Sequence, residues 1–194
     1  TVRNVDKLVF EFDEIEGLSF DGRGERADEA RVYYWYCTEG KIESKPFRLP
    51  YQVAASIAQF YEPQIALERL MAGGLLPSTL TDKEKESAVR RLKLARNWVE
   101  MFPEKKIKPM GDQGMIVETS AIADAFRKIH DVYSYEDLDG EELQALLYRV
   151  AREFGLEPSE FFRLGYRLFL GSDSGPRLGN FLASLDKALV LKRL

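Results

Sequence analysis

Cysteine and histidine are nearly absent from this chain of 194 residues, which contains only Cys37 and His130. A single cysteine cannot form a disulfide within the chain, and the two residues together cannot supply a Cys/His zinc cluster. We therefore expect a metal-free protein of a reducing, cytoplasmic compartment. Long apolar runs are also missing, since no segment approaches the ~20 residues that cross a bilayer, and no signal-peptide segment precedes the first charges. These absences favour a soluble protein.

Apolar residues nevertheless make up 45% of the chain and aromatic residues 12%, which is enough to build a hydrophobic core. Internal repeats and low-complexity tracts are lacking. The length suits one domain or two small ones.

The net charge of −4 argues against a uniformly basic nucleic-acid binder, but it conceals a pattern of blocks. Residues 1–44 and 109–144 carry net charges of −5 and −7, whereas residues 82–108 and 145–194 carry +4 and +3. Local positive patches on an acidic body suit a module that must grip one part of a nucleic acid without binding every polyanion. The alternative interpretation is ordinary surface patterning.

Helical periodicity dominates the chain. Apolar residues recur at steps of three and four in four segments, 82–102, 120–133, 139–154 and 158–170, which places them on one face of a helix in each case. Thr81 or Asp82 can cap the first of these helices and Ser120 the second. Asp139 and Glu142 have the spacing of a capping box for the third. The spacing therefore predicts four amphipathic helices.

Weaker signals predict further short helices and two connecting segments. We expect helices over 25–36, 51–61, 64–71, 176–185 and from Asp186 to the end of the chain, whereas 5–15 is ambiguous and 41–49 and 105–118 are expected to be linker and loop. The fold class that follows is all-α, with about eight to ten short helices. Trp98 is expected in the core and Cys37 is expected to be buried. Of the consecutive aromatic residues 33–36, some must point into the core because a helix turns them in different directions.

Three sequence elements suggest a family. The chain ends in Ser172-Asp-Ser-Gly-Pro-Arg-Leu-Gly-Asn-Phe followed by a helical tail, and Ala95-Arg-Asn-Trp98 and Phe154-Gly-Leu-Glu-Pro-Ser-Glu-Phe-Phe162 precede it. Over residues 45–194 the chain resembles the carboxyl-terminal part of class I lysyl-tRNA synthetases. The resemblance implies a helical cage that binds the tRNA anticodon over residues 46–194. It also implies a helical segment over residues 1–45 that connects this cage to a catalytic domain.

The two ATP-binding signatures of class I synthetases are not found in this sequence, which has neither a His-x-Gly-His-like element nor a Lys-Met-Ser-Lys-Ser-like loop. The resemblance therefore implies ATP and magnesium as cofactors of a whole enzyme, and none for this chain. It further implies lysine-accepting tRNA and the missing catalytic domain as partners. The chain begins at Thr1 without methionine, as an excised part of a longer enzyme would.

Recognition of the unpaired bases of an anticodon calls for aromatic or guanidinium planes for stacking and for basic groups that hold phosphates. Arg163, Tyr166 and Arg167 share one face of the helix over 158–170. The tRNA-binding candidates are these three residues together with Arg177 at the start of the next helix, and Arg96 and Lys93 on the basic side of the helix over 82–102. Alternative interpretations are that Arg163 and Arg167 pair with acidic neighbours such as Glu160, and that Arg177 fixes a turn.

Two other readings remain open from the sequence. One is the terminal domain of a glutamyl-tRNA synthetase-like enzyme, which has a similar Gly-Pro-plus-helix ending; the full Gly175-Pro-Arg-Leu-Gly179 spelling favours the lysyl family. The other is a free-standing helical scaffold that binds a protein through the aromatic residues 32–36. An independent enzyme is disfavoured, because no nucleophile–base pair or metal cluster stands out and no catalytic residue is assigned.

Overall fold

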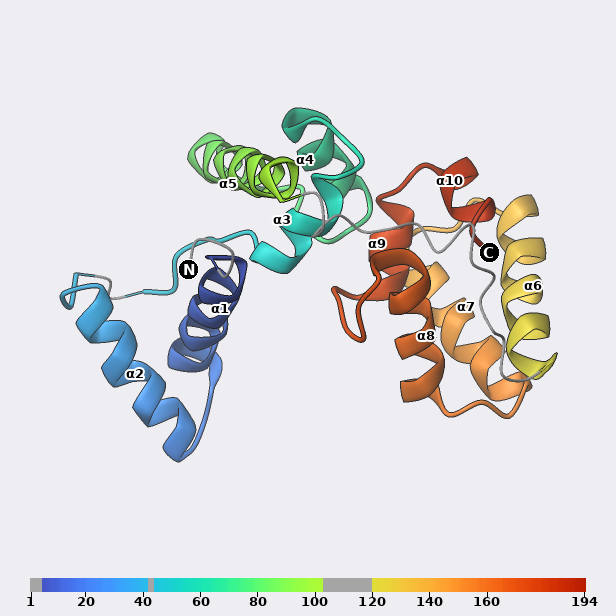
Figure 1. Ribbon diagram of the computed structural model, residues 1–194, viewed down its shortest axis with the longest axis horizontal. Coiled ribbons are helices and arrows are strands. Elements are labelled where there is room, and N and C mark those ends of the chain that lie inside the picture. Colours follow the sequence, from blue (N-terminus) through green and yellow to red (C-terminus); the bar gives the residue numbers. More distant parts are fainter. Residues whose placement is uncertain (1–4, 42–43, 103–119) are drawn as a thin grey trace.

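The computed structural model describes residues 5–41, 44–102 and 120–194, and in these ranges every regular element is an α-helix (Figure 1). The helices are α1 (Val5–Asp21), α2 (Glu25–Cys37), α3 (Tyr51–Ile57), α4 (Pro63–Ala72), α5 (Asp82–Met101), α6 (Ser120–Tyr135), α7 (Gly140–Glu153), α8 (Pro158–Leu170), α9 (Leu178–Ala183) and α10 (Lys187–Leu191). The predicted all-α fold is confirmed. None of these helices combines the length and the apolar character that a membrane span requires.

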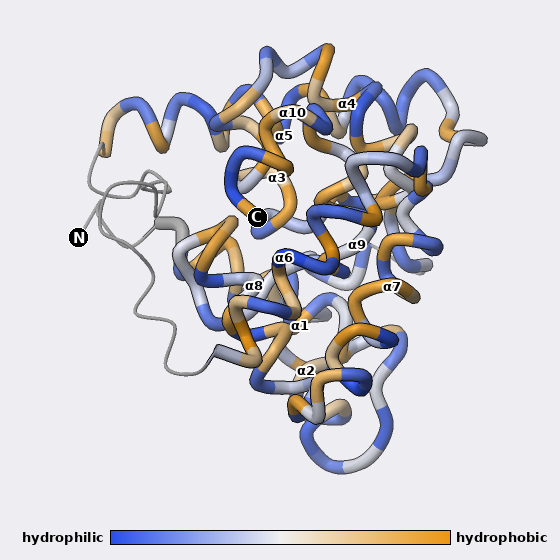
Figure 2. Tube along the Cα trace, turned by 90° about the vertical axis from the view of Figure 1, so that its right-hand side faces the viewer, coloured by the Kyte–Doolittle hydropathy of each residue, from blue (hydrophilic) through white to orange (hydrophobic). Residues whose placement is uncertain are grey.

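The helices form three packed groups. α1 and α2 make a hairpin, α3 and α4 pack on α5, and α7 packs on α6, α8 and α9, with α10 against α6 and α9. Figure 1 places the hairpin at one end of the molecule and α6, α7 and α8 at the other. One hydrophobic core extends from Leu49 to Val190 and takes residues from α3 to α10. Hydrophobic and hydrophilic residues alternate in short segments along most helices, as expected for amphipathic elements (Figure 2).

The two strongest predicted helix starts are confirmed by their hydrogen bonds. Thr81 and Glu84 form a reciprocal capping box at α5, and Asp139 and Glu142 form another at α7. Each box satisfies backbone N–H groups that have no partner inside the helix, and such a cap contributes about 1 kcal/mol. α8 ends at Gly171, whose φ of 61° is the left-handed conformation that glycine adopts at helix ends.

Some predictions about local structure need correction, and others fall on residues that the structure does not describe. The ambiguous segment 5–15 is part of a longer helix, and the helix predicted over 51–61 ends at Ile57. Asp186 precedes α10 but its side chain does not cap it; the carboxylate instead accepts hydrogen bonds from Arg69 and from the hydroxyl of Tyr61. The predicted loop 105–118 and the residue that precedes α6 lie outside the described residues. The division at residue 45 stays a prediction.

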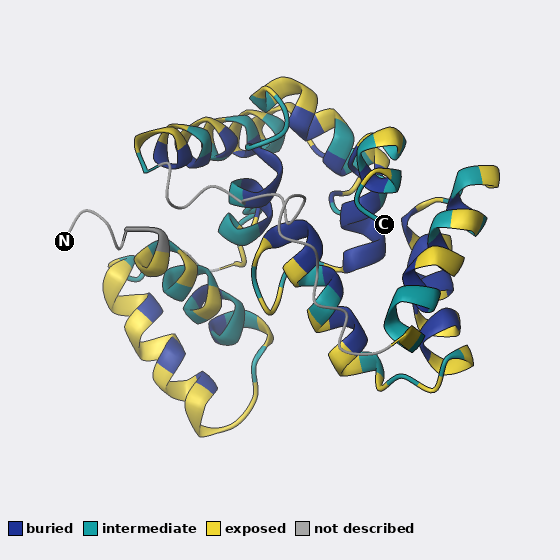
Figure 3. Cartoon of the chain, turned by 45° about the vertical axis from the view of Figure 1, so that its right-hand side comes forward, coloured by how far each residue is buried: buried dark blue, intermediate teal, exposed yellow. Residues whose placement is uncertain are grey.

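The expected burial of Cys37 is wrong, whereas that of Trp98 is confirmed. α2 buries Ala27, Ala30 and Tyr34 against α1 and presents its remaining residues to solvent. Figure 3 shows the buried residues along one side of α2 only. Cys37 is the last residue of this helix and has no second layer of structure over it in the described part of the chain.

Polar contacts attach the hairpin to the rest of the molecule. The buried carboxylate of Glu16 in α1 accepts two hydrogen bonds from Arg48 and one from the hydroxyl of Tyr34. Asp13, one turn earlier, accepts hydrogen bonds from Arg91 of α5 and from the backbone N–H of Tyr51, which begins α3. α1 is thereby tied to α2, α3 and α5 at once.

Candidate nucleic-acid interface

α7 and α8 present polar and aromatic residues on the sides that do not enter the core. The two helices run in sequence, separated by a short turn in which Gly155 has a φ of 65°. Leu143, Leu147 and Val150 anchor α7 in the core, while Phe161 and Phe169 anchor α8. Their burial fixes the rotation of each helix about its axis, and therefore fixes which residues remain exposed.

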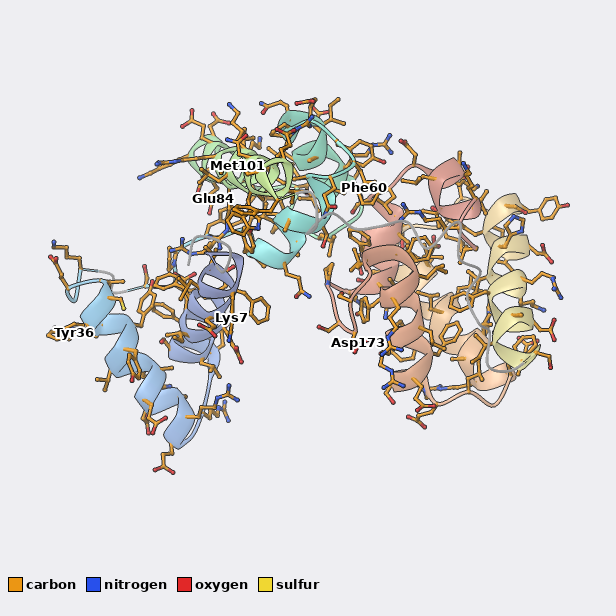
Figure 4. The ribbon with its side chains drawn as sticks, viewed as in Figure 1. Lys7, Tyr36, Phe60, Glu84, Met101 and Asp173 are labelled. Carbon is orange, nitrogen blue, oxygen red and sulfur yellow. The ribbon has the colours of Figure 1, made fainter. Side chains whose placement is uncertain are left out.

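The structure places three of the predicted residues together on α8. Arg163 lies 3.7 Å from Glu160, and Arg167 forms an ion pair with Asp173 in the following turn, whose position is labelled in Figure 4. The hydrogen bond from Arg167, with added attraction from Arg167 and Arg163, holds the pKa of Asp173 below its usual value. Arg167 therefore contacts Asp173 directly, and Arg163 acts on the same carboxylate only through its charge. These are exposed ion pairs, which contribute about 0–1 kcal/mol and can exchange one anion for another at little cost.

Tyr166 is half-buried between the two arginines in sequence and lies near a tyrosine of the neighbouring helix. Burial raises the pKa of its phenol, and the proximity of Tyr148 of α7 raises it further. Tyr148 in turn packs on Phe162, with ring centroids 4.6 Å apart and planes inclined by 53°. Tyr148 remains 42% exposed, so part of this aromatic side chain is accessible to solvent. This geometry allows a planar base to stack on the ring.

Sequence analysis missed the contribution of α7 to this surface. Tyr148, Arg149 and Arg152 are exposed, and the described part of the structure contains no ion pair or hydrogen bond of the two arginine side chains. The spacing of these three residues in the sequence indicates a shared exposed face, because in a helix it places them on the side opposite Leu143 and Leu147. We call Tyr148, Arg149 and Arg152 of α7, with Arg163, Tyr166 and Arg167 of α8, the α7–α8 surface.

Arg177 occupies the N-cap position of α9, one residue before the first helical residue, and its guanidinium forms an ion pair with Glu141 of α7. The expectation that it lies just inside the helix is therefore corrected by one position. The contact joins α9 to the first turn of α7. Because α9 has only six residues and Arg177 already has a carboxylate partner, the interpretation that Arg177 fixes the turn gains support.

The residues around Arg177 form the joint between four helices. The backbone N–H of Gly179 donates to the buried Oε1 of Gln144 at 2.7 Å, and the side-chain amide of Asn180 donates to the carbonyl of Gly73 at 3.0 Å. A Cβ on Gly179 would lie 2.3 Å from the backbone nitrogen of Gln144, and one on Gly165 would lie 2.6 Å from Leu178. The Gly-Pro-Arg-Leu-Gly element thus has a structural basis in close helix approach.

The two predicted residues on α5 have different surroundings. Arg96 is only 31% exposed and contacts Glu62 at 2.7 Å, Glu100 at 3.0 Å and the carbonyl of Tyr61 at 3.2 Å. It ties α5 to the turn before α4. Lys93 is exposed, and no partner of its ammonium group lies in the described ranges. α5 packs chiefly on α3 and α4, and the structure does not bring Arg96 and Lys93 to the α7–α8 surface.

Acidic residues of the chain do not form a metal site in the part that the structure describes. Asp137 pairs with Lys187, and Asp139 and Glu142 are engaged in the cap of α7. Among the described residues there is no group of three or more His, Cys, Asp or Glu side chains arranged to hold a metal ion.

No protein-family model matches the chain. Among curated proteins it is similar to the lysine-tRNA ligase of Pyrococcus furiosus, with 33% identity over 201 residues that cover 96% of this chain and 37% of that protein. The lysine-tRNA ligase of Pyrococcus horikoshii is 32% identical with the same coverage, and that of Natronomonas pharaonis is 31% identical over 100% of this chain and 36% of its own length. The chain thus spans little more than a third of the relatives that it matches. Over nearly all of its length, the chain is homologous to part of the archaeal lysine-tRNA ligases.

Proposed function

We propose that this chain is the tRNA-binding part of a lysine-tRNA ligase and that it contacts the anticodon region of lysine tRNA. The whole enzyme would attach lysine to this tRNA at the expense of ATP, through a catalytic part that is not among these 194 residues. The similarity to lysine-tRNA ligases over almost the entire chain carries the proposal. The glutamyl alternative loses ground, because the relatives named above all bear the lysine name.

The α7–α8 surface supplies the chemistry that an unpaired base and its phosphates require. Tyr148 offers an exposed ring held at a fixed tilt by Phe162, and Tyr166 lies beside it. Stacking of a base on an aromatic side chain contributes about 1–3 kcal/mol. Arg149 and Arg152 have no acidic partner in the described residues and are available for phosphate oxygens.

The arginines of α8 have a second role in this proposal. Arg167 pairs with Asp173 and Arg163 with Glu160 in the free protein, and an approaching phosphate would compete with these carboxylates for the guanidinium groups. The acidic neighbours Asp173 and Glu160 would then repel polyanions that bind only weakly and without specificity. Selection of one anticodon requires base-edge hydrogen bonds in addition, for which the guanidinium groups are suitable donors.

Binding of the 194-residue chain to lysine tRNA, compared with a copy whose anticodon has been exchanged, tests the proposal. Fluorescence anisotropy at two salt concentrations separates base recognition from phosphate attraction, because only the second weakens steeply with salt. We expect a preference of at least about tenfold for the native anticodon, or about 1.4 kcal/mol, that persists at the higher salt concentration. Equal affinity for both tRNAs at both salt concentrations would contradict anticodon selection by this chain.

A further inference from the structure

Four large apolar residues stand exposed on α2. Val32 is 69%, Tyr33 66%, Trp35 64% and Tyr36 79% exposed, and Tyr36 points away from α1 in Figure 4. At about 100° per residue these four side chains spread over an arc of about 160°, opposite the buried Tyr34. We call these four residues the outer face of α2. The helix that packs on α2 is α1, on the other side, and Gly40 of the following turn lies against Trp35.

Such a surface is unusual for a helix face that is exposed to water. Single exposed apolar residues are common, but a contiguous group of three aromatic rings and a valine is typical of an interface. Tyrosine and tryptophan are also the residues that contribute most to protein–protein binding. The outer face of α2 therefore has the composition of a docking surface for an apolar partner.

The net negative charge of residues 1–44 disfavours nucleic acid as the partner of this face. Residues 1–44 contain 6 basic and 11 acidic side chains. Glu25 and Glu29, in the preceding turns of the same helix, have no cationic partner in the described ranges, and Asp28 pairs with Arg31. A phosphate backbone would be repelled here, whereas the basic and aromatic α7–α8 surface lies at the other end of the molecule. A protein surface with apolar and basic groups is the complementary partner.

The length of the relatives points to a partner for the outer face of α2. The match to the ligases of Pyrococcus covers 37% of their length, so nearly two thirds of such a polypeptide lies outside the region that corresponds to this chain. We propose, on the basis of the proposed function, that the outer face of α2 docks on the catalytic part of the ligase polypeptide. The contacts from Asp13 to Arg91 and from Glu16 to Arg48 hold the hairpin in place against the rest of the chain. Docking of α2 would therefore set the position of the α7–α8 surface relative to the catalytic part.

Cys37 provides a direct probe of this docking. It is exposed, ends α2 directly after Tyr36, and is the only cysteine of the chain. The experiment measures the rate at which a maleimide labels Cys37 in the 194-residue chain and in the ligase-length polypeptide that carries it, with peptide mass spectrometry to identify the labelled thiol. The matched control is the thiol introduced by Tyr135→Cys in a Cys37→Ser background, since Tyr135 of α6 is 91% exposed at the far end of the molecule.

We expect Cys37 to be labelled at least about tenfold more slowly in the ligase-length polypeptide, while the control thiol reacts at the same rate in both. The double substitution Trp35→Ser and Tyr36→Ser should restore fast labelling in the long polypeptide. Because both side chains are exposed, the helix content of the isolated chain should not change. Equal labelling rates of Cys37 in the two proteins would overturn the proposal.

A second copy of the chain is the competing partner, and the same measurement recognises it. Slow labelling of Cys37 already in the isolated chain, together with a dimer in sedimentation, would assign the face to self-association and overturn docking on the catalytic part. The outcome is independent of tRNA. A chain that ignores the anticodon but shows protected Cys37 in the long polypeptide would refute anticodon selection and leave the docking intact.

Discussion

Arg48 encloses the buried carboxylate of Glu16 through two hydrogen bonds, from Nε to Oε2 at 2.7 Å and from Nη2 to Oε1 at 2.9 Å. The hydroxyl of Tyr34 donates to the same carboxylate at 2.9 Å. The three residues come from α1, α2 and the segment before α3, so one carboxylate closes the hairpin and fastens it to the cage. A buried ion is tolerated here because each of its oxygen atoms has a charged donor.

Replacement of this carboxylate is expected to weaken the fold. Glu16→Gln leaves the half-buried guanidinium of Arg48 without its counter-charge, and hydrogen bonds to charged groups contribute about 1.5–3 kcal/mol. We expect the free energy of unfolding in urea to fall by about 2 kcal/mol. Glu14→Gln is the matched control, because Glu14 forms an exposed ion pair with Arg26 that contributes less than about 1 kcal/mol. Equal effects of the two substitutions would contradict the role assigned to Glu16.

The same site makes stability depend on pH in the alkaline range. Burial, together with the hydrogen bond to Glu16, raises the pKa of Tyr34 from 10.0 to about 12. Since the folded pKa exceeds the unfolded one, the protonated phenol stabilises the fold fully below pH 10, and this contribution is lost as the pH rises towards 12. The difference in unfolding free energy between Tyr34→Phe and the natural chain should therefore change across this interval and stay constant below it. Chemical denaturation at several pH values measures it.

The elements that depend on neighbouring residues were predictable, and those that depend on distant contacts were not. Thr81 and Asp139 predict helix starts because the glutamates with which they form capping boxes lie only three residues later in the chain. Arg177 could not be paired with Glu141 from the sequence, since 36 residues separate them. Cys37 was expected to be buried because unpaired cysteine is usually buried, but the rotation of α2 is decided by its packing on α1 and leaves Cys37 exposed.

The candidate site shows the same division. Arg163, Tyr166 and Arg167 share one helix and were found by spacing. Tyr148 escaped notice because its importance arises from contact with Phe162 across two helices. Spacing within one helix identifies a face, but only tertiary packing shows which faces meet.

Two glycine-to-alanine substitutions are expected to have opposite effects on stability. Gly179 lies where α9 closely approaches α7, whereas Gly17 has free space around it. In Gly179→Ala the new Cβ would lie 2.3 Å from the backbone nitrogen of Gln144, and neither helix can move without disturbing the joint. Overpacking of this kind costs about 1–3 kcal/mol. In Gly17→Ala no atom lies within 4 Å of the new Cβ, and the position is inside α1. Alanine should stabilise that helix by about 0.5–1 kcal/mol. Thermal unfolding of both variants checks the contrast.

Stacking on Tyr148 predicts a selective loss of tRNA affinity. Tyr148→Ala should weaken binding of lysine tRNA by about 5- to 150-fold, corresponding to about 1–3 kcal/mol for one base. Tyr148→Phe keeps the ring and should retain most of the affinity. Tyr135→Ala removes a tyrosine of α6 that is even more exposed than Tyr148 and should have no effect. A loss of affinity as large for Tyr135→Ala as for Tyr148→Ala would exclude a specific stacking site on α7.

Arg149 and Arg152 lead to a prediction about the dependence of binding on salt. A guanidinium group that neutralises a phosphate releases counterions, so each such contact steepens the decline of affinity with salt by somewhat less than one unit of log–log slope. Arg149→Ala with Arg152→Ala should therefore reduce this slope by between one and two and weaken the lysine tRNA and its anticodon-exchanged copy by the same factor. Arg23→Ala is the control, because Arg23 is exposed in the acidic hairpin far from α7. An unchanged slope in the double variant would mean that these guanidinium groups do not contact phosphates, and base recognition on Tyr148 would then need another source of affinity.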